Sequence, residues 1–223
     1  MIFRSVRDAA KAICLLTCLG ATVWGGGAHA AGVLDRVGAG GKLLIGHRES
    51  SIPFSYVDAD KKPVGYAVDL CLKLAEAVRK KTGAKNMQVE MVQVTSANRI
   101  AMVAEGKVDL ECGSTTNNAD RNKQVGFAIN YFYTGTRFIV KAGSSVKSVD
   151  DLKGKKVVST TGTTNYQVLR KVNAEKNLGF ELIGAKDHGE SLLLVQYIDD
   201  IDGLLVGGGR ANMVQCTGPC HFG

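Results

Sequence analysis

The stretch "MQVEMVQVTSANRIAMVAEGKVDLEC", residues 87–112, holds the clearest evidence on fold class because it alternates two kinds of element. Residues 87–94 alternate apolar with other side chains, as a half-buried strand does. Residues 96–107 have the pattern of a short helix, and Gly106 supplies its end. Residues 108–112, "VDLEC", are again read as a strand. A strand, a helix and a strand in this order predict an α/β layer with a mainly parallel sheet.

The same alternation continues towards the N-terminus. Residues 41–50 read as a short buried strand, and residues 65–83 read as a helix that ends at Gly83. The apolar residues at helical spacing in that helix are Val68, Leu72, Ala75 and Val78.

The pattern restarts after an extended segment near residues 130–142. Residues 148–177 predict a short helix, a strand at "KKVVST" and a helix from about Thr163, and "FELIGAKDHGESLLLV" adds another strand and a polar turn. Two α/β units joined by an extended crossover predict two lobes, with a ligand cleft beyond the carboxyl ends of the strands. The predicted organisation is a first lobe at 31–134, a second lobe at 135–206 and an atypical tail at 207–223.

The first thirty residues have the composition of a secretory signal peptide. A basic start precedes an apolar run from Ala12 to Trp24, and Ala28-His29-Ala30 has the small-x-small form of a cleavage site. The apolar run is too short to span a bilayer. We therefore expect export with removal of residues 1–30. A lipoprotein attached through Cys18 is a weaker alternative, because it would cut the apolar region short.

Charge and cysteine content narrow the class further. The formal net charge of +7 falls to +5 when the leader takes away three basic residues and one acidic residue, and no Lys/Arg block predicts a nucleic-acid partner. Cys71 on the long helix and Cys112 at the end of a neighbouring strand could form a disulfide or remain two buried thiols. "CTGPCH" at 216–221 has no partner cluster, so neither a metal nor a cofactor is expected.

Polar turns follow the predicted strands, and three of them contain an arginine: Arg48, Arg99 and Arg121. Arg99 falls in the first turn of a predicted helix, where the helix dipole disfavours a cation unless an anion binds. Taken alone, Arg99 is more simply explained by contact with solvent. Three arginines at three strand ends, however, predict an anion site, because a guanidinium binds a carboxylate through two parallel hydrogen bonds.

Two further turns leave alternatives open. Thr163 and Thr164 stand at a helix start that could bind an anion or be capped in the ordinary way, and the lysine of a phosphate-binding loop is absent there. His188 could be a general base, a pH-dependent cation or a structural histidine, and no G-x-S-x-G motif supports a nucleophilic triad. The paired aspartates of "QYIDD" at 196–200 have no accompanying polymerase segment and are interpreted as chance.

Five segments together resemble a known family. "GHRESSIPFSY", "VTSANRI", "LECGSTTNNADR", "STTGTTN" and "AKDHGES" are similar, in order and spacing, to the glutamate/aspartate-binding proteins of bacterial ABC importers, which are periplasmic polar-amino-acid-binding proteins. The resemblance runs from about residue 33 to 191. It implies a two-lobed, type II periplasmic-binding-protein-like fold whose cleft closes on L-glutamate or L-aspartate and then docks on an inner-membrane ABC permease. It also implies a periplasmic, monomeric protein without enzyme activity.

The resemblance assigns a role to eight residues. It implies that Arg121, Ser114, Thr116 and Thr164 hold the α-carboxylate of the ligand. It implies that Arg48, Arg99 and His188, with Ser96 beside them, meet the side-chain carboxylate. Asp199 or Asp200 could correspond to an aspartate that receives the ligand's ammonium group, but their distance from His188 is shorter than the family's.

The C-terminal segment departs from the family. The glycine-rich end after residue 191 resembles a truncated or frameshifted sequence, so the second crossover and part of the first lobe are expected to be missing. Two alternatives to a binding protein follow: an exported dehydratase-like enzyme on the same scaffold, with His188 or Glu190 as its acid or base, and an inactive fragment.

Overall fold

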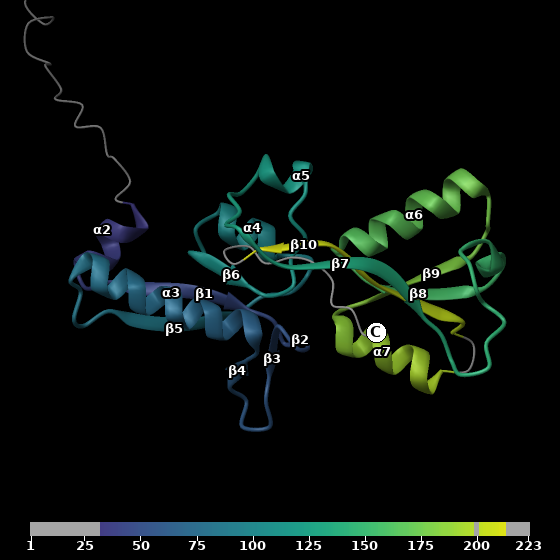
Figure 1. Cartoon of the computed structure of the whole chain (residues 1–223), viewed down its shortest axis with the longest axis horizontal. Coiled ribbons are helices and arrows are strands. Elements are labelled where there is room, and N and C mark those ends of the chain that lie inside the picture. Colours follow the sequence, from purple (N-terminus) through teal and green to yellow (C-terminus); the bar gives the residue numbers. More distant parts are fainter. Residues whose placement is uncertain (1–31, 199–200, 213–223) are drawn as a thin grey trace, which may run out of the picture. The chain divides into compact units, whose positions relative to one another are not determined.

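The computed structural model describes residues 32–198 and 201–212 (Figure 1). The predictions made on the leader at 1–30, on Asp199 and Asp200, and on Cys216 and Cys220 lie outside these residues. Within the described ranges, no helix is both long and apolar enough to cross a membrane.

The first sheet is parallel and has the strand order β5-β1-β6. Central β1 (Lys42–His47) pairs with β5 (Gln88–Gln93) along its whole length and with β6 (Leu110–Cys112) at its carboxyl end. Three helices belong to this part of the chain: α2 (Val33–Gly38), α3 (Tyr66–Thr82) and α4 (Arg99–Ala104). The strand–helix–strand order expected from residues 87–112 is confirmed, although α4 is shorter than the predicted helix.

Helix α3 has the expected bounds and, except for Leu72, the expected buried face. Its basic last turn and the left-handed Gly83 that caps it, at φ 68°, end the helix where the sequence predicts. The residues buried along α3 are Ala67, Val68, Cys71 and Ala75, whereas Leu72 is 41% exposed. Val78 also packs against the first core, and Cys71, on the same buried face, is bonded to β6.

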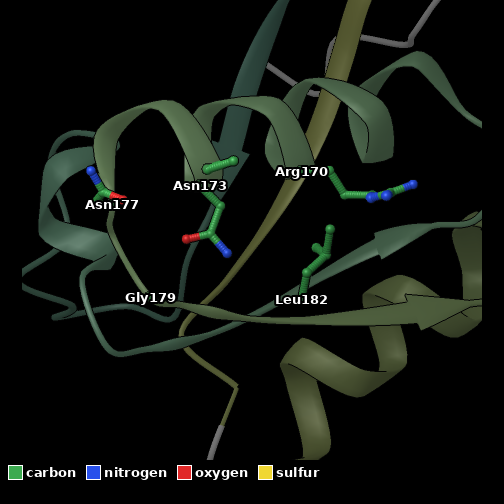
Figure 2. Close-up of a pocket in the computed structure, with 6 residues that line it drawn as sticks. Arg170, Asn173, Asn177, Gly179 and Leu182 are labelled. Carbon is green, nitrogen blue, oxygen red and sulfur yellow. The ribbon is translucent and has the colours of Figure 1, made fainter.

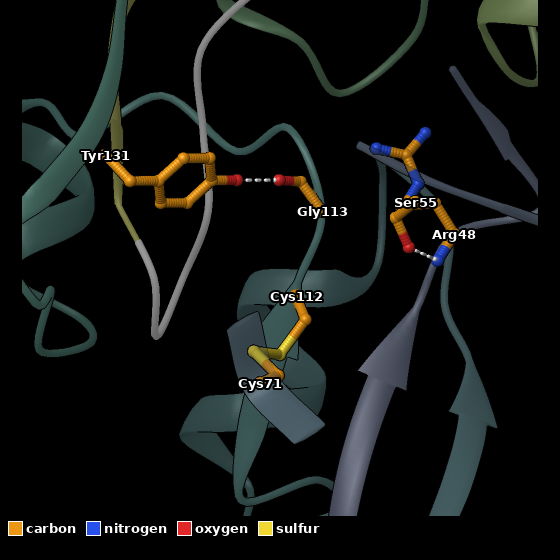
Figure 3. Close-up of a disulfide and its surroundings, with 6 residues drawn as sticks. All are labelled: Arg48, Ser55, Cys71, Cys112, Gly113 and Tyr131. Atoms are coloured by element: carbon orange, nitrogen blue, oxygen red, sulfur yellow. Dashed lines mark hydrogen bonds between the residues drawn. A yellow bond between two sulfur atoms is a disulfide. The ribbon is translucent and has the colours of Figure 1, made fainter. Parts of the chain in front are cut away.

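A disulfide joins α3 to β6. Cys71 and Cys112 are both fully buried and bonded, with 6.4 Å between their Cα atoms, which decides between the two alternatives that the sequence left open (Figure 3). The bridge closes a loop with a sequence separation of 41 residues. In the chain-entropy model, such a loop stabilises the fold by about 4 kcal/mol. It sits in the first hydrophobic core, beside Leu43 and Ile45 of β1.

A small antiparallel sheet that the sequence did not predict follows β1. It consists of β2 (Ser50–Ser51), β3 (Ser55–Val57) and β4 (Pro63–Val64). Its strands are too short to show a two-residue period, so periodicity could not reveal them. Phe54, between β2 and β3, packs with Ala67 of α3 and with Tyr131 and Phe132.

The second large sheet has the order β7-β10-β8-β9. The predicted extended segment is β7 (Asn130–Ile139), and the strands at "KKVVST" and "FELIGA" are β8 (Lys156–Thr160) and β9 (Glu181–Ala185). The helical elements of this region are the 3-10 turn η1 (Asp150–Leu152), α6 (Thr164–Lys176) and α7 (His188–Tyr197), whereas α5 (Ala119–Asn122) follows β6 of the first sheet. Two clusters, one around Leu152 and Leu169 and one around Val158 and Val195, form its core.

Strand β10 (Gly203–Asn212) is a difference from the expectation. The sequence predicts that the returning crossover is missing, but β10 runs antiparallel beside β7, from Leu204 opposite Ile139 to Asn212 opposite Asn130. It also pairs in parallel with β8. Backbone hydrogen bonds alone make this ladder, so a glycine-rich strand can form it without the side-chain alternation that identifies strands in a sequence.

Candidate functional site

All three predicted arginines are buried beyond strand ends. Arg48 directly follows β1 and is 1% exposed, Arg99 is the first residue of α4 and is 2% exposed, and Arg121 lies in α5 and is 8% exposed. The simpler expectation for Arg99, that it reaches solvent, is therefore wrong. Buried arginines are uncommon because moving a guanidinium out of water is unfavourable unless charge and hydrogen bonds compensate.

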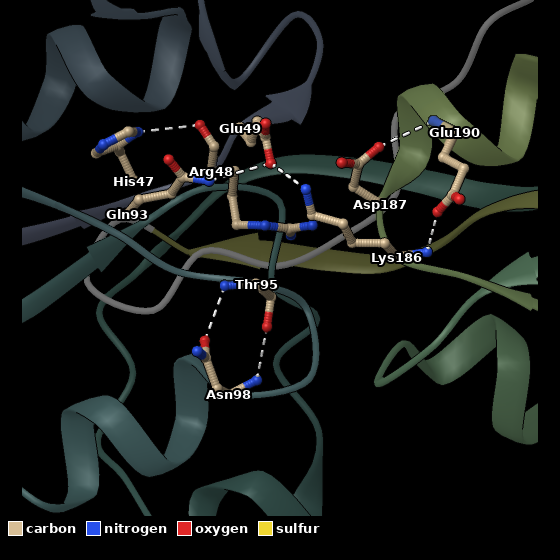
Figure 4. Close-up of polar contacts among 9 residues, drawn as sticks. All are labelled: His47, Arg48, Glu49, Gln93, Thr95, Asn98, Lys186, Asp187 and Glu190. Carbon is tan, nitrogen blue, oxygen red and sulfur yellow. Dashed lines mark hydrogen bonds and ion pairs between the residues drawn. The ribbon is translucent and has the colours of Figure 1, made fainter.

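Arg48 connects the turns after β1 and β5. Its backbone N–H donates to the Ser55 hydroxyl at 2.9 Å (Figure 3), and its Nη2 donates to the Ser96 hydroxyl at 2.6 Å. Two predicted site residues, Arg48 and Ser96, thus meet directly. The turn that carries Ser96 is held by reciprocal bonds between Thr95 and Asn98, at 2.8 and 3.1 Å, just before Arg99 (Figure 4).

Arg121 connects the turns after β6 and β8. Asn118 caps α5 by accepting a hydrogen bond from the Arg121 backbone N–H at 2.9 Å, and this fixes the start of the short helix. The Arg121 guanidinium donates to the carbonyl oxygens of Thr116 at 2.9 Å and Gly162 at 3.1 Å. The hydroxyls of Thr116 and Thr164 lie 3.1 Å apart. Arg121, Thr116 and Thr164 therefore converge here, on segments that follow strands of two different sheets.

His188, the first residue of α7, lies among hydroxyl groups. Its Nδ1 is 2.9 Å from the Thr160 Oγ1, and its Nε2 is 3.5 Å from the Ser114 Oγ. Burial, with smaller contributions from the charges of Arg48 and Arg99, lowers the pKa of His188 to about 3. The ring is thus neutral near pH 7. Of the roles the sequence left open, a hydrogen-bonding neutral histidine fits this setting and a cation does not.

Glu111 is the residue of this site that the sequence analysis missed. It is the middle residue of β6, is 1% exposed, and is the one carboxylate classed as buried in the described part of the chain. Burial raises the pKa of its carboxyl group, while the charges of Arg99 and Arg48, the Thr115 hydroxyl and the charge of Arg121 oppose that rise. Its position between Leu110 and Cys112 was the available signal, because a strand alternates faces and its neighbours pack in the first core.

An ion pair at the edge of this site joins the turns after β1 and β9. The Lys186 Nζ lies 2.7 Å from the Glu49 carboxylate, and Gln93 donates to the same carboxylate at 3.0 Å (Figure 4). The Lys186 backbone N–H donates to the Glu190 carboxylate, and the Glu190 N–H donates to Asp187, the cap of α7, at 2.9 Å. Both partners of the ion pair are partly exposed, at 43% and 59% of their side chains.

The turn after β8 also approaches the turn after β5 closely. A Cβ atom at Gly162 would lie 2.5 Å from the Ala97 Cα and 2.6 Å from the Ser96 carbonyl oxygen. Neither contact is sterically possible, so only glycine fits at this position. A Cβ at Gly189 of α7 would lie 2.2 Å from the Oγ of Ser50, which is the end of a side chain and not backbone.

A separate surface pocket lies between α6 and β9 (Figure 2). It has a volume of about 440 Å³ and is lined by Arg170, Asn173, Ala174, Asn177, Gly179 and Leu182. None of the eight predicted site residues is among them. The side-chain amide of Asn173 is already bonded to the backbone of Phe180, donating at 2.8 Å and accepting at 3.2 Å.

Comparison with known sequences identifies close relatives. The chain is 48% identical over 166 residues to a protein of Salmonella typhimurium named glutamate/aspartate import solute-binding protein. It is 47% identical over 166 residues to the L-glutamate/L-aspartate-binding protein of Pseudomonas aeruginosa. Each match covers 74% of this chain and 55% of the relative, so the chain spans about half the length of the curated relatives it matches.

Comparison with solved structures supports the fold class. The cysteine-binding protein of Campylobacter jejuni superposes with a TM-score of 0.66 at 26% identity, over 77% of this chain and 66% of that one. An ancestral arginine-binding protein bound to arginine gives a TM-score of 0.64 at 27% identity, over 82% and 85%. The ancestral amino-acid-binding protein AncCDT-1, a precursor of cyclohexadienyl dehydratase, gives 0.68 at 25%, over 78% and 73%. The expected two-lobed α/β fold of periplasmic binding proteins is confirmed.

A family model covers the whole site. It is the model of bacterial extracellular solute-binding proteins, family 3, and it matches residues 43–193, which include every residue placed in the site above. By this match over more than half of its length, the chain belongs to the bacterial extracellular solute-binding proteins of family 3.

Proposed function

We propose that this protein is the extracytoplasmic binding component of an amino-acid ABC importer and that it binds L-glutamate or L-aspartate. The observation that carries the proposal is the group of three buried arginines with hydroxyl side chains beside them. Several guanidinium groups in one buried site favour a ligand with more than one carboxylate. The names of the relatives from Salmonella typhimurium and Pseudomonas aeruginosa support the same ligands.

The contacts support a division of the site into two ends. Arg121, Thr116 and Thr164, with Ser114 nearby, would hold the α-carboxylate that all amino acids share. Arg48, Arg99 and Ser96 would hold the side-chain carboxylate, and the neutral ring of His188 would donate a hydrogen bond to it. Each charge-assisted hydrogen bond of this kind contributes about 1.5–3 kcal/mol.

The two-lobe division supports the same mechanism. We propose a boundary within β7 near residues 134 and 135, because Tyr131 and Phe132 pack with Phe54 of the first lobe, whereas Phe138 and Ile139 pack in the two clusters of the second sheet. A ligand held by residues of both lobes would favour a closed form. That form would then dock, as a periplasmic monomer, on a membrane permease.

A dehydratase-like activity is less well supported. One structural relative is named as a precursor of cyclohexadienyl dehydratase, which keeps the enzyme alternative open. Of the two candidate acid or base groups, His188 has a pKa lowered to about 3, and Glu190 accepts a hydrogen bond from the Lys186 backbone at the exposed edge of the site. A binding protein without turnover agrees better with these two environments. Incubation with prephenate-like acids, with no loss of substrate, is the expected result.

The experiment that tests the proposed function is isothermal titration of the purified chain with L-glutamate, L-aspartate and L-glutamine. We expect saturable heat with the two acids, with a Kd in the micromolar range and a binding free energy of about −8 kcal/mol. Glutamine should bind much more weakly. A thermal melt by circular dichroism accompanies the titration. No saturable heat, together with a cooperative melt, would contradict the proposal, and a melt without a cooperative transition would support the inactive-fragment alternative.

A further inference from the structure

Glu111 has a position that none of the roles above explains. Its side chain points to the face of β6 opposite the disulfide, since Leu110 and Cys112 pack in the first core on the other side. The preceding acid on the same face, Asp109, is bound to Arg36 and to the Leu44 backbone N–H. Glu111 instead faces the site.

The backbone at Gly113 makes room for the Glu111 carboxylate. A Cβ atom on Gly113 would lie 2.5 Å from the Glu111 Oε1 and 2.8 Å from the Arg48 Cγ. The carboxylate oxygen and the stem of Arg48 therefore converge on this residue. The Tyr131 hydroxyl donates to the Gly113 carbonyl oxygen at 2.5 Å, which holds the turn in place (Figure 3).

The groups that face Glu111 come from every element around it. The cations are Arg48 after β1, Arg99 of α4 and Arg121 of α5, and the Thr115 hydroxyl lies on its own turn. His188 of α7 experiences the same two cations, Arg48 and Arg99, and is neutral. Three guanidinium groups and one carboxylate give this cluster a net charge of +2 when Glu111 is ionised and +3 when it is protonated.

We propose that Glu111 is a resident carboxylate that shares the three arginines with the ligand and takes up a proton when an acidic amino acid binds. This inference rests on the proposed function, because it requires an anionic ligand at the arginine cluster. An arriving carboxylate raises the pKa of a nearby carboxyl group, by like-charge repulsion and by competing for the same cations. In the empty site Glu111 neutralises part of the arginine charge, and in the occupied site the ligand does so.

Linkage fixes the sign of the pH effect. Because the occupied site binds one more proton than the empty one, affinity rises as pH falls through the interval between the pKa values of Glu111 in the two states. The ligand side chain stays ionised above about pH 5.5, since an ordinary glutamate has a pKa of about 4.3. Titrations between pH 6 and pH 8 therefore report on the protein.

The test is calorimetric titration with L-glutamate in buffers of different ionisation enthalpy at each pH, using wild type and Glu111→Gln. We expect wild type to take up a fraction of a proton on binding, and we expect the variant to take up none. Because the glutamine side chain is neutral at every pH, Glu111→Gln should also bind glutamate several-fold more tightly than wild type at pH 8. Its ligand-free form should melt at a lower temperature, since the three arginines lose their internal counter-charge. A merely structural role would not tighten binding.

Two control variants attribute the proton. Glu90→Gln removes an exposed glutamate of β5 that pairs with Lys42, so it should leave proton uptake unchanged. His188→Asn removes the other titratable group of the site; its affinity should fall, because His188 would donate a hydrogen bond to the ligand, but proton uptake per mole of bound glutamate should remain. Equal uptake in wild type and Glu111→Gln, or its loss in His188→Asn alone, would overturn the proposal.

The remaining outcomes are also decisive. Saturable glutamate binding to wild type with no buffer dependence anywhere between pH 6 and pH 8 would overturn this inference and leave the proposed function intact. No saturable binding of either acidic amino acid would overturn both. If Glu111→Gln does not fold, the wild-type buffer series still decides, because it measures the linked proton directly.

Discussion

Arg99 is the residue at which ligand charge should be recognised. It begins α4, is almost fully buried, and acts electrostatically on Glu111 and on His188. Arg99→Gln keeps a polar side chain but removes the charge that a side-chain carboxylate would meet. We expect the affinity of Arg99→Gln for glutamate to fall by about 1.5–3 kcal/mol, roughly 10- to 150-fold. Its affinity for glutamine should change little.

The matched comparison is Arg121→Gln, at the end of the site that would hold the α-carboxylate. That variant should lose glutamate and glutamine alike. Titration of both variants with glutamate and with glutamine measures these losses of affinity. An equal loss of the two ligands in Arg99→Gln would contradict the division of the site.

His188 should make the ligand-free protein sensitive to acid. Its pKa is about 3 in the fold and 6.5 in an unfolded chain, so below pH 6.5 the unfolded state binds a proton that the folded state does not. This part of the stability is fully present above pH 6.5 and is lost as pH falls towards 3. Between pH 7 and pH 4 we expect a loss on the order of 2–4 kcal/mol.

Denaturant unfolding at several pH values, for wild type and His188→Asn, measures this difference. The variant should lose less stability than wild type between pH 7 and pH 4. If the free energies of unfolding of wild type and His188→Asn fall equally with pH, the ring of His188 is not held neutral in the fold.

At the residue scale, the sequence identified the three arginines of the site but not Glu111, the acid that lies among them. Arg48, Arg99 and Arg121 stood out because each follows a predicted strand, at the edge where an α/β sheet binds its ligand. Glu111 did not stand out, since a charged residue within a short strand is usually on the solvent face. Its burial depends on three arginines from other elements, and sequence spacing cannot show that they meet.

At the scale of elements, the turn after β8 is fitted to the turn after β5. Gly162, at φ +73°, has no room for a Cβ against the backbone of Ser96 and Ala97. Gly162→Ala should therefore hold these turns apart and weaken glutamate binding at least about tenfold, because residues on both turns would contact the ligand. Titration with glutamate measures the loss.

Gly154→Ala is the control for that prediction. Gly154 has nearly the same backbone conformation, at φ +71°, but nothing lies within 4 Å of its Cβ position. Both variants should lose about 1–2 kcal/mol of stability from the left-handed conformation. Only Gly162→Ala should lose affinity, and the same loss in both would mean that strain rather than contact is responsible.

The elements that the sequence predicted are those with a period long enough to measure. Helices α3 and α6 and strands β1, β5, β8 and β9 were all expected, and the start of α6 at the Thr163 cap was correct. The β2–β4 sheet and β10 were not expected. Two-residue strands and a glycine-rich strand are defined by backbone pairing with distant partners, which leaves no local pattern.

At the scale of the whole molecule, ligand binding should appear as thermal stabilisation. A ligand that binds only the folded state adds about 2.7 kcal/mol at one hundred times its Kd. For a domain of this size that corresponds to a rise in Tm of about 5–10 °C. The measurement is a melt with L-glutamate, and L-glutamine at the same concentration is the control.

The salt dependence of that rise tests whether the arginines act in a buried setting. Added salt should reduce the stabilisation only modestly, because buried charges are screened much less than exposed ones. A stabilisation that disappears at high salt would indicate a ligand on the surface of the protein instead.

The ion pair between Glu49 and Lys186 has a practical consequence. These two partly exposed side chains, one after β1 and the other after β9, stand 2.7 Å apart. A carbodiimide can condense such a carboxylate and amine into an amide without any spacer atom. Peptide mapping by mass spectrometry would then find the two tryptic peptides joined. The yield of this cross-link would measure how often the turns after β1 and β9 are in contact.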